Sequence, residues 1–231
     1  MITSRLPSIS IPAESTASSL LAAQSLRGRV LKRGGDIVFS LLVLSLGSPL
    51  FLLLAVLVKL SSRGSVFYRQ RRIGRGYKGF GCLKFRTMRR DADRVLASML
   101  EADPKLRAEF ERDHKLKRDP RITPLGKFLR RSSLDELPQF INVLRGEMSV
   151  VGPRPIVWDE LRRYGRNMDE VLSVRPGLTG LWQVSGRNNL TYRTRVRLDL
   201  TYVRQRSFWL DLGIVLRTIG VVLLPMDRGA Y

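Results

Sequence analysis

One stretch of the chain is apolar throughout and has no polar face. Residues 37–58 read IVFSLLVLSLGSPLFLLLAVLV and contain no charged side chain. A straight α-helix of this length reaches about 33 Å, enough to cross a hydrocarbon core of about 30 Å. Pro49 lies in its middle, directly after Ser48, and a proline there removes a backbone donor and kinks the helix. The pattern predicts two short helical arms joined at Ser48 and Pro49, with Ser48 able to satisfy a carbonyl freed at the break.

Basic residues flank this stretch on both sides, including Arg29 and Lys32 before it and Lys59 and Arg63 after it. Lys and Arg close to the ends of a membrane segment stay in the cytoplasm, so a single crossing would place one basic flank on the wrong side. Each arm is only about 16 Å long and cannot cross alone. A re-entrant helix-break-helix over residues 31–60 satisfies both flanks. Bilayer physics alone leaves a kinked spanning helix as the alternative.

The remaining pattern predicts an α+β, mostly α-helical domain. Residues 66–68 and 81–88 are expected to form a small β-hairpin around a glycine-rich turn. Apolar residues at steps of three and four predict helices over 91–117, broken near Pro104, and over 134–145, ended by Gly146. Shorter helices are expected over 125–131, 158–164 and 192–206. We expect a proline-braced turn at 150–155 and a loop at 175–187.

Residues 208–224 are strongly apolar and carry only Asp211 and Arg217 as charges. This composition is typical of an amphipathic helix at a membrane interface, and equally of a core helix. Residues 1–30 are rich in Ser and Thr and poor in large apolar side chains, which predicts a disordered N-terminal tail. The expected organisation is this tail, the re-entrant segment over 31–60, and a cytoplasmic catalytic domain over 61–231.

Charge and composition limit the ligands. The chain has 231 residues, a net charge of +21, and no acidic residue between Ile37 and Arg90. Such a surface attracts anionic membrane lipids by about 1 kcal/mol per nearby base, and it also fits nucleic acid or a phosphorylated ligand. The single cysteine excludes an internal disulfide, and the single histidine excludes a metal site built from several histidines.

Two adjacent carboxylates, Asp135 and Glu136, are the main candidates for chemistry. They occur in RRSSLDELPQ, at an expected helix start. One interpretation is structural: Ser133 and Glu136 form a capping box, and acidic residues stabilise helix N-termini. The functional interpretation is that the helix dipole and upstream bases such as Arg130 keep Asp135 ionised and nucleophilic, while Glu136 holds a divalent cation.

Three further segments carry candidate ligands for anions. Arg154 lies between two prolines in GPRP, so little entropy is lost when it binds an oxyanion. Lys84 and Arg86 alternate along an expected strand and would share one face as a two-pronged phosphate clamp. A solvated surface turn and a solvated strand face are the respective alternatives.

The third segment, RPGLTG, begins at Arg175 and is followed by Gln183 and Arg187. Its glycines would let backbone N–H groups approach a phosphate or a sugar. A plain loop is the alternative interpretation of this segment.

Taken in order, these segments resemble the bacterial sugar transferase family, the monotopic phosphoglycosyl transferases that load a sugar phosphate onto polyprenyl phosphate. The resemblance covers roughly residues 31–224. It rests on KRGGDIVFS, GSPLFLLLAVLVKL, GSVFYRQRRIG, KFRTM, DPRITPLGKFLRRSSLDELPQFINVLRGEMSVVGPRP and VRPGLTGLWQVSGR. The chain is similar to the minimal form of the family, and most similar to its exopolysaccharide-initiating, galactose-phosphate type.

The resemblance implies specific roles. The membrane helix would be re-entrant and broken at Ser48–Pro49, which favours the hairpin over the spanning helix. Asp135 would be the nucleophile, and Mg²⁺ would be the cofactor, held by Glu136 and Asp135. Arg154 would help to bind the nucleotide phosphate, and Arg130 stands where the family places a base ahead of the dyad.

The expected activity is transfer of hexose 1-phosphate from UDP-hexose to polyprenyl (undecaprenyl) phosphate at the cytoplasmic face of the bacterial inner membrane. UMP would leave, and an aspartyl-phosphosugar would form and react onward. Anionic membrane lipids are expected partners, nucleic acid is not, and a homodimer is compatible with the family. The alternatives are a membrane-tethered basic binding protein, whose affinity would fall steeply with salt, and a glycosyltransferase that releases UDP.

Overall fold

The computed structural model describes residues 26–113, 116, 119–186 and 189–223. Most of the expected N-terminal tail, residues 1–25, lies outside this part of the chain. The last residues of that expected tail, 26–30, are already helical. The helix that contains the first half of the apolar stretch therefore begins in the basic flank before it.

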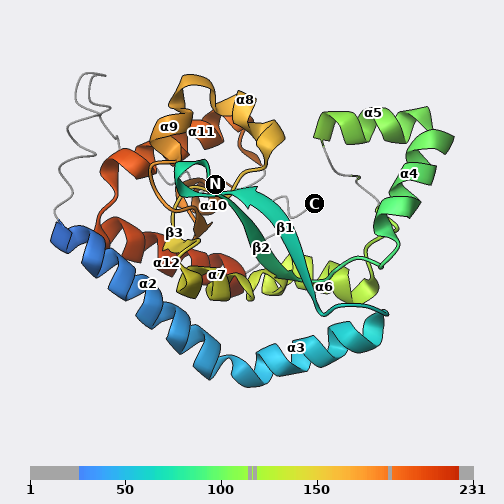
Figure 1. Ribbon diagram of the computed structural model, residues 1–231, viewed down its shortest axis with the longest axis horizontal. Coiled ribbons are helices and arrows are strands. Elements are labelled where there is room, and N and C mark those ends of the chain that lie inside the picture. The colour runs from blue at the N-terminus through green and yellow to red at the C-terminus, as the bar shows by residue number, and fades with distance from the viewer. Residues whose placement is uncertain (1–25, 114–115, 117–118, 187–188, 224–231) are drawn as a thin grey trace, which may run out of the picture.

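The expected helix-break-helix is confirmed. Helix α2 (Leu26–Leu46) and helix α3 (Ser48–Ser61) meet at an angle of 65° and form the V along the lower edge of Figure 1. Pro49 lies in the first turn of α3, where its missing N–H has no helical partner to lose. The hydroxyl of Ser48 donates to the carbonyl of Ser45 at 2.8 Å. A Cβ at Gly47 would lie 2.6 Å from the Val43 carbonyl oxygen, so the bend also needs a glycine.

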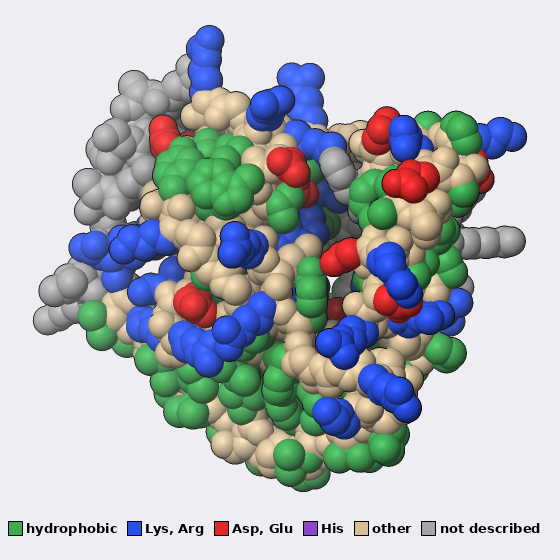
Figure 2. Space-filling model, turned by 45° about the vertical axis from the view of Figure 1, so that its right-hand side comes forward, with side chains coloured by type: hydrophobic (Ala, Val, Ile, Leu, Met, Phe, Trp, Pro, Cys, Tyr) green, Lys and Arg blue, Asp and Glu red, His purple; other side chains and the backbone are tan. Residues whose placement is uncertain are grey.

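Within the described ranges, no single helix has both the length and the apolar composition needed to cross a bilayer, whereas the bent pair satisfies these criteria together. Large apolar side chains on both arms are exposed to solvent, among them Leu42, Leu46, Leu52 and Val56. Figure 2 shows hydrophobic side chains gathered along the lower edge, with lysines and arginines above them. A continuous apolar surface bordered by charge is typical of a membrane or protein contact.

A β-hairpin crosses the middle of the molecule (Figure 1). Strands β1 (Phe67–Ile73) and β2 (Gly79–Phe85) pair antiparallel, and a 3₁₀ turn, η2 (Arg75–Tyr77), joins them. The register pairs Tyr68 with Lys84, Gln70 with Cys82, and Arg72 with Phe80. Side chains that face each other across antiparallel strands share one face of the sheet. Arg72, Gln70 and Lys84 therefore project from the same face of the hairpin.

The other elements are mostly short helices: α4 (Ala92–Ala102), α5 (Pro104–Asp113), α6 (Pro124–Ser132), η3 (Leu134–Glu136), α7 (Gln139–Arg145), η4 (Trp158–Glu160), α8 (Leu161–Tyr164), η5 (Gly165–Asn167), α9 (Met168–Val171), α10 (Leu181–Ser185), α11 (Tyr192–Gln205) and α12 (Phe208–Leu223). Two short strands, β3 (Ser149–Val151) and β4 (Gly177–Thr179), pair in parallel. The predicted break before Pro104 is confirmed.

Two sequence expectations about local structure are wrong. The helix expected over 134–145 is divided into η3 and α7, because Pro138 lies at the boundary and cannot donate to a continuous helix. The loop expected over 175–187 contains β4 and α10. The pairing of β4 with β3 is long-range, so the local pattern of glycines did not indicate it.

The bent pair is part of the main core. Phe39 and Val43 of α2 pack on a buried cluster that includes Phe140, Val143 and Ile214. In a second cluster, Leu54 and Val58 of α3 pack against Phe85 and Leu129. The face of α12 around Ile214 is buried, whereas Phe208 and Trp209 at its start are exposed, so α12 is both a core helix and an amphipathic surface helix.

A buried polar network ties α2 to α12. The ammonium of Lys32 lies 3.0 Å from Asp36 Oδ1 and 3.0 Å from Asp211 Oδ2. Asp36 also accepts the backbone N–H of Val150 at 3.1 Å, and the Tyr202 hydroxyl donates to Asp211 at 2.8 Å. Lys32, from the basic flank of the apolar stretch, thus makes its ion pairs within the protein.

Candidate active site

The Asp135–Glu136 dyad lies on the short turn η3, directly after α6. Ser133 ends α6 in the left-handed region, at a φ of 58°, and turns the chain toward β2. The Ser133 side chain makes no capping hydrogen bond to η3, so the capping-box interpretation is wrong. Asp135 is buried, with 7% of its surface exposed, and the Glu136 side chain is about one-third exposed at 33%.

Lys84 of β2 joins the two carboxylates. Its ammonium donates to Glu136 Oε1 at 2.6 Å and lies 4.0 Å from Asp135 Oδ2. Because β2 and η3 are far apart in the sequence, the hairpin face described above is what brings this cation to the dyad. The site therefore consists of one ammonium that faces two carboxylates. It is hydrogen-bonded to Glu136 and lies farther from Asp135.

The two carboxylates differ in basicity. Burial raises the pKa of Asp135 to about 6, with a further contribution from the Glu136 charge and opposition from Lys84 and Arg130. Burial also disfavours ionised Glu136, but the charge and hydrogen bond of Lys84 outweigh it and lower the pKa of Glu136. Asp135 is thus the more basic carboxylate of the dyad. Its ionised form rests on nearby cations, since a three-residue turn has little dipole.

Arg130 is fixed beside the dyad through the segment KFRTM. Its Nε donates to the hydroxyl of Thr87 at 2.9 Å. The backbone N–H of Thr123 donates to the Thr87 carbonyl at 3.0 Å, and a Cβ at Gly126 would lie only 2.0 Å from that oxygen. The start of α6 therefore packs directly on the chain at Thr87, which explains why a glycine occurs there.

Arg154 also reaches this region. Its guanidinium lies 3.6 Å from Glu160 Oε1, and its positive charge contributes to the lowered pKa of Glu136. Two neighbours of Arg154 were not predicted from the sequence: Arg72 and Glu160, which also form an ion pair with each other. Arg72 shares the hairpin face of Lys84, and the alternation of Arg72 with Gln70 along β1 is consistent with this. The alternation alone could not reveal it, because the register of β1 against β2 is also needed.

Two predicted ligands lie elsewhere. Arg86 follows the end of β2, and its guanidinium donates to the carbonyl of Val58 in the last turn of α3 and to those of Ser62 and Ser65 just after it. The expected clamp of Lys84 and Arg86 on one strand face is therefore wrong. Arg175 Nε donates to the Gly146 carbonyl at 2.7 Å, at the C-terminal end of α7. Arg187 lies outside the described residues.

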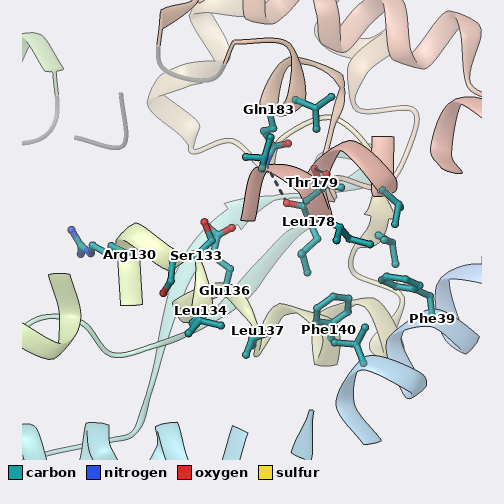
Figure 3. A pocket seen from close by; sticks show the side chains of 18 of the residues that line it. Phe39, Arg130, Ser133, Leu134, Glu136, Leu137, Phe140, Leu178, Thr179 and Gln183 are labelled. Atoms are coloured by element: carbon teal, nitrogen blue, oxygen red, sulfur yellow. Dashed lines mark hydrogen bonds between the residues drawn. The ribbon is translucent and has the colours of Figure 1, made fainter. Parts of the chain in front are cut away.

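A pocket of about 520 Å³ begins at Glu136, the member of the dyad that lines it. Glu136, Arg130 and Gln183 lie at its polar end, and the Gln183 amide donates to the Leu178 carbonyl at 3.2 Å (Figure 3). Its other walls are mostly apolar and come from α2, the end of η3, α7, β4, α10 and α12: Phe39, Val43, Leu137, Phe140, Leu178, Trp182, Val215 and Ile219. A charged end that continues into an apolar interior suits an amphiphile better than a wholly polar ligand.

The carboxylates fit a shared metal site. Among the described residues, no group of three or more His, Cys, Asp or Glu side chains could hold a metal by itself. Mg²⁺ is usually bound through one or two carboxylates, with substrate phosphates and water completing its shell. Asp135 and Glu136, adjacent in the chain and on one turn, supply this kind of donor set.

The comparison with known proteins agrees with this geometry. Residues 27–225 match the sequence pattern described as bacterial sugar transferase. The chain belongs to the bacterial sugar transferase family. The resemblance of the sequence motifs to that family is thereby confirmed.

Three relatives illustrate the range of this family. The exopolysaccharide production protein ExoY of Sinorhizobium fredii is 50% identical over 204 residues, which cover 88% of this chain and 89% of ExoY. An uncharacterized sugar transferase of Haemophilus influenzae is 55% identical over 89% of this chain and 43% of its own length. The undecaprenyl-phosphate galactose phosphotransferase of Salmonella typhimurium is 51% identical over 88% of this chain and 42% of its own. The chain thus spans most of ExoY but under half of the other two.

Proposed function

We propose that this protein transfers hexose 1-phosphate from UDP-hexose to polyprenyl (undecaprenyl) phosphate, releases UMP, and so initiates exopolysaccharide assembly. The observation that carries the proposal is a buried, relatively basic Asp135 beside Lys84, next in the chain to Glu136, which lines the polar end of an apolar pocket. The names of the Sinorhizobium and Salmonella relatives support an exopolysaccharide role and an undecaprenyl-phosphate acceptor.

In the first step, a carboxylate oxygen of Asp135 attacks the β-phosphorus of UDP-hexose. The bond from that phosphorus to the bridging oxygen breaks, and UMP leaves with the bridging oxygen and its electron pair. The product on the enzyme is an aspartyl-phosphosugar, so one difficult displacement becomes two easier ones.

The obstacle to this attack is repulsion between like charges. Two unit negative charges at about 5 Å repel by about 3 kcal/mol at an effective dielectric constant of about 20. Lys84, Arg130 and Arg154 reduce this repulsion, and positioned cations of this kind account for most of the catalysis in phosphoryl transfer. Asp135 and Glu136 would hold Mg²⁺ together with the phosphate oxygens, and the bound ion would neutralise further charge.

In the second step, an oxygen of polyprenyl phosphate attacks the same phosphorus. The bond to Asp135 breaks, the carboxylate is restored, and polyprenyl-diphosphate-hexose leaves. The pocket supports this order of events, because its apolar walls accept the first isoprenoid units while its polar end holds the acceptor phosphate beside Glu136 and Arg130.

The same arrangement supports a place at the cytoplasmic face of the bacterial inner membrane. In this proposal α2 and α3 enter one leaflet as a re-entrant hairpin, and basic residues such as Arg29 and Arg63 lie against anionic lipids. Phe39 and Val43 of α2 belong to both the hairpin and the pocket wall. The lipid acceptor can then reach the dyad without leaving the bilayer.

The decisive experiment compares wild type with Asp135→Asn, using UDP-hexose labelled in the sugar. Wild type is expected to release UMP and to carry label on the denatured protein when acceptor is absent. Asp135→Asn is expected to do neither, while Asp93→Asn, an exposed acid on α4, behaves as wild type. Near-normal lipid-linked product from Asp135→Asn would refute the nucleophile. Release of UDP instead of UMP would identify an ordinary glycosyltransferase.

A further inference from the structure

Glu160 lies between two guanidinium groups. Its Oε2 atom is 3.5 Å from Arg72 Nη1, and its Oε1 atom is 3.6 Å from Arg154 Nη1. Charge-assisted hydrogen bonds between such groups are usually about 2.7–2.9 Å long. The carboxylate is therefore shared loosely between both arginines, while Oε2 also accepts the backbone N–H of Val157 at 3.1 Å.

The two arginines are held very differently. Arg72 is only 9% exposed, and its guanidinium donates to the Pro155 carbonyl at 3.1 Å and to Gln70 Oε1 at 2.9 Å. The side chain of Arg154 is 38% exposed and pairs with Glu160. The guanidinium of Arg72 is thus fixed by hydrogen bonds from both of its terminal nitrogens, whereas Arg154 can leave Glu160 with little rearrangement.

Both arginines belong to the electrostatic environment of the dyad. Cys82 lies on the same hairpin face as Lys84 and Arg72. Burial raises the pKa of the Cys82 thiol to about 11, while the positive charges of Lys84, Arg72 and Arg154 all act on it in the opposite direction. Lys84, Arg72 and Arg154 also interact electrostatically with Glu136, so all three cations act on the dyad.

We infer that Glu160 is an internal anion that occupies Arg154 in the free enzyme and yields it to the diphosphate of the nucleotide donor, while Arg72 retains Glu160. This inference rests on the proposed function and adds two residues to it. Glu160 sets the affinity for the nucleotide by competing with it, and Arg72 is a positioning residue for Glu160 and the GPRP turn.

When Arg154 exchanges Glu160 for the phosphate of the nucleotide, no buried charge is left unpaired. A carboxylate that lost its only cation would face a large desolvation cost. Glu160 keeps Arg72 and the Val157 N–H when Arg154 moves to phosphate, so this cost is avoided. When UMP leaves, Arg154 returns to Glu160. Because Glu160 competes for Arg154, UMP binds less tightly and is released more easily after the first step.

Glu160→Gln tests this inference, because glutamine keeps an oxygen that can accept the Val157 N–H and removes only the charge. We measure UMP binding to the full chain in detergent by calorimetry. Removing one competing charge is expected to tighten UMP binding about fivefold to tenfold. The matched control is Asp159→Asn, which removes the same charge from the neighbouring exposed residue and is expected to change binding less than about twofold. Equal or weaker UMP binding by Glu160→Gln, or an equal gain in the control, would overturn the inference.

A second measurement separates competition for Arg154 from a general change in charge. In an Arg154→Gln background, Glu160→Gln is expected to produce no gain in UMP affinity, since the contested cation is missing. A persistent gain would overturn the inference. Uridine, which has no phosphate, is expected to bind equally to wild type and Glu160→Gln, and improved uridine binding would also refute it. These assays need no turnover, so their outcome is separate from the test of Asp135 as nucleophile.

Discussion

The ammonium of Lys84 donates a 2.6 Å hydrogen bond to Glu136, and this contact joins the β-hairpin to the turn that carries the dyad. The two charges support each other. Burial disfavours the charged ammonium, yet the carboxylates of Glu136 and Asp135 outweigh it and raise the pKa of Lys84. Lys84 is thus a permanent cation beside the proposed nucleophile.

Replacing Lys84 by methionine is expected to lower kcat/KM for UDP-hexose by about 100-fold or more, because the charge that offsets approach of the diphosphate is lost. Steady-state release of UMP measures the effect. Lys127→Met, an exposed lysine on α6, provides the matched control and is expected to be near wild type. A loss of less than about threefold for Lys84→Met would exclude a role for this ammonium in charge neutralisation.

The pocket predicts a selective effect on the lipid substrate. Ile219 of α12 lines the pocket, and Leu216, on the same helix, is exposed and does not line it. Ile219→Trp is expected to raise KM for polyprenyl phosphate about tenfold while leaving KM for UDP-hexose unchanged, because the larger ring fills space needed by the isoprenoid chain. Leu216→Trp is expected to change neither constant. A parallel rise in both KM values for Ile219→Trp would contradict this assignment.

The bent pair predicts that both basic flanks lie on one side of the membrane. Cysteines placed at Arg29 and at Arg63, which are both exposed, are expected to react with an impermeant maleimide only in inverted vesicles. The native Cys82 is buried and should remain unlabelled, so it serves as the internal control. Labelling of one flank from each side of the membrane would establish a kinked spanning helix instead.

Arg86 is expected to act on stability. Methionine at this position leaves carbonyls in the last turn of α3 and just after it without their donor, and the free energy of unfolding should fall by about 2 to 3 kcal/mol. Arg63→Met, at an exposed position nearby, should change it by less than about 0.5 kcal/mol. Thermal unfolding of both variants measures this difference. An unchanged melting temperature together with a large rise in KM for UDP-hexose would restore the phosphate-binding role.

Asp199 is expected to make the free energy of unfolding depend on pH. It is fully buried, with 0% of its surface exposed, and its Oδ2 atom accepts the Tyr164 hydroxyl at 3.0 Å. Burial raises the pKa of Asp199 to about 7, whereas an unfolded aspartate titrates near 4. Between these values the unfolded chain is ionised and the folded protein holds the proton. Rising pH therefore removes stability across this window, by up to about 4 kcal/mol.

Asp199→Asn cannot ionise, and its amide oxygen can still accept from Tyr164. The difference in melting temperature between pH 5 and pH 8 should therefore be smaller in this variant than in wild type. Differential scanning fluorimetry at both pH values measures it. Parallel pH profiles for the two proteins would show that Asp199 is not the group responsible.

Features set by short-range rules were predictable from the sequence. The break at Ser48–Pro49 follows from the geometry of proline, and so does the break before Pro104. Asp135 and Glu136 were recognisable because they are adjacent in the chain and occur within a highly specific order of motifs. Each of these signals is contained within a few residues.

Features that depend on long-range packing were not predictable in the same way. Arg86 and Arg175 resemble phosphate ligands in the sequence, but backbone carbonyls at or beyond distant helix ends bind them. The position of Arg72 beside Arg154 depends on the register of β1 and β2, and on a turn far along the chain. A basic side chain in the sequence does not reveal whether its acceptor is a substrate or the protein itself.

The contact between Lys32 and Asp211 has a consequence for biogenesis. Lys32 lies near the start of the bent pair, and its acidic partner is translated only after the residues that we propose for the active site. If the pair inserts as we propose, it can enter the lipid during synthesis, but its junction with α12 cannot close until the ribosome has delivered that helix. A nascent chain that stalls before Asp211 would hold the bent pair and a complete dyad, yet the α12 wall of the pocket that we propose for the lipid acceptor would be missing.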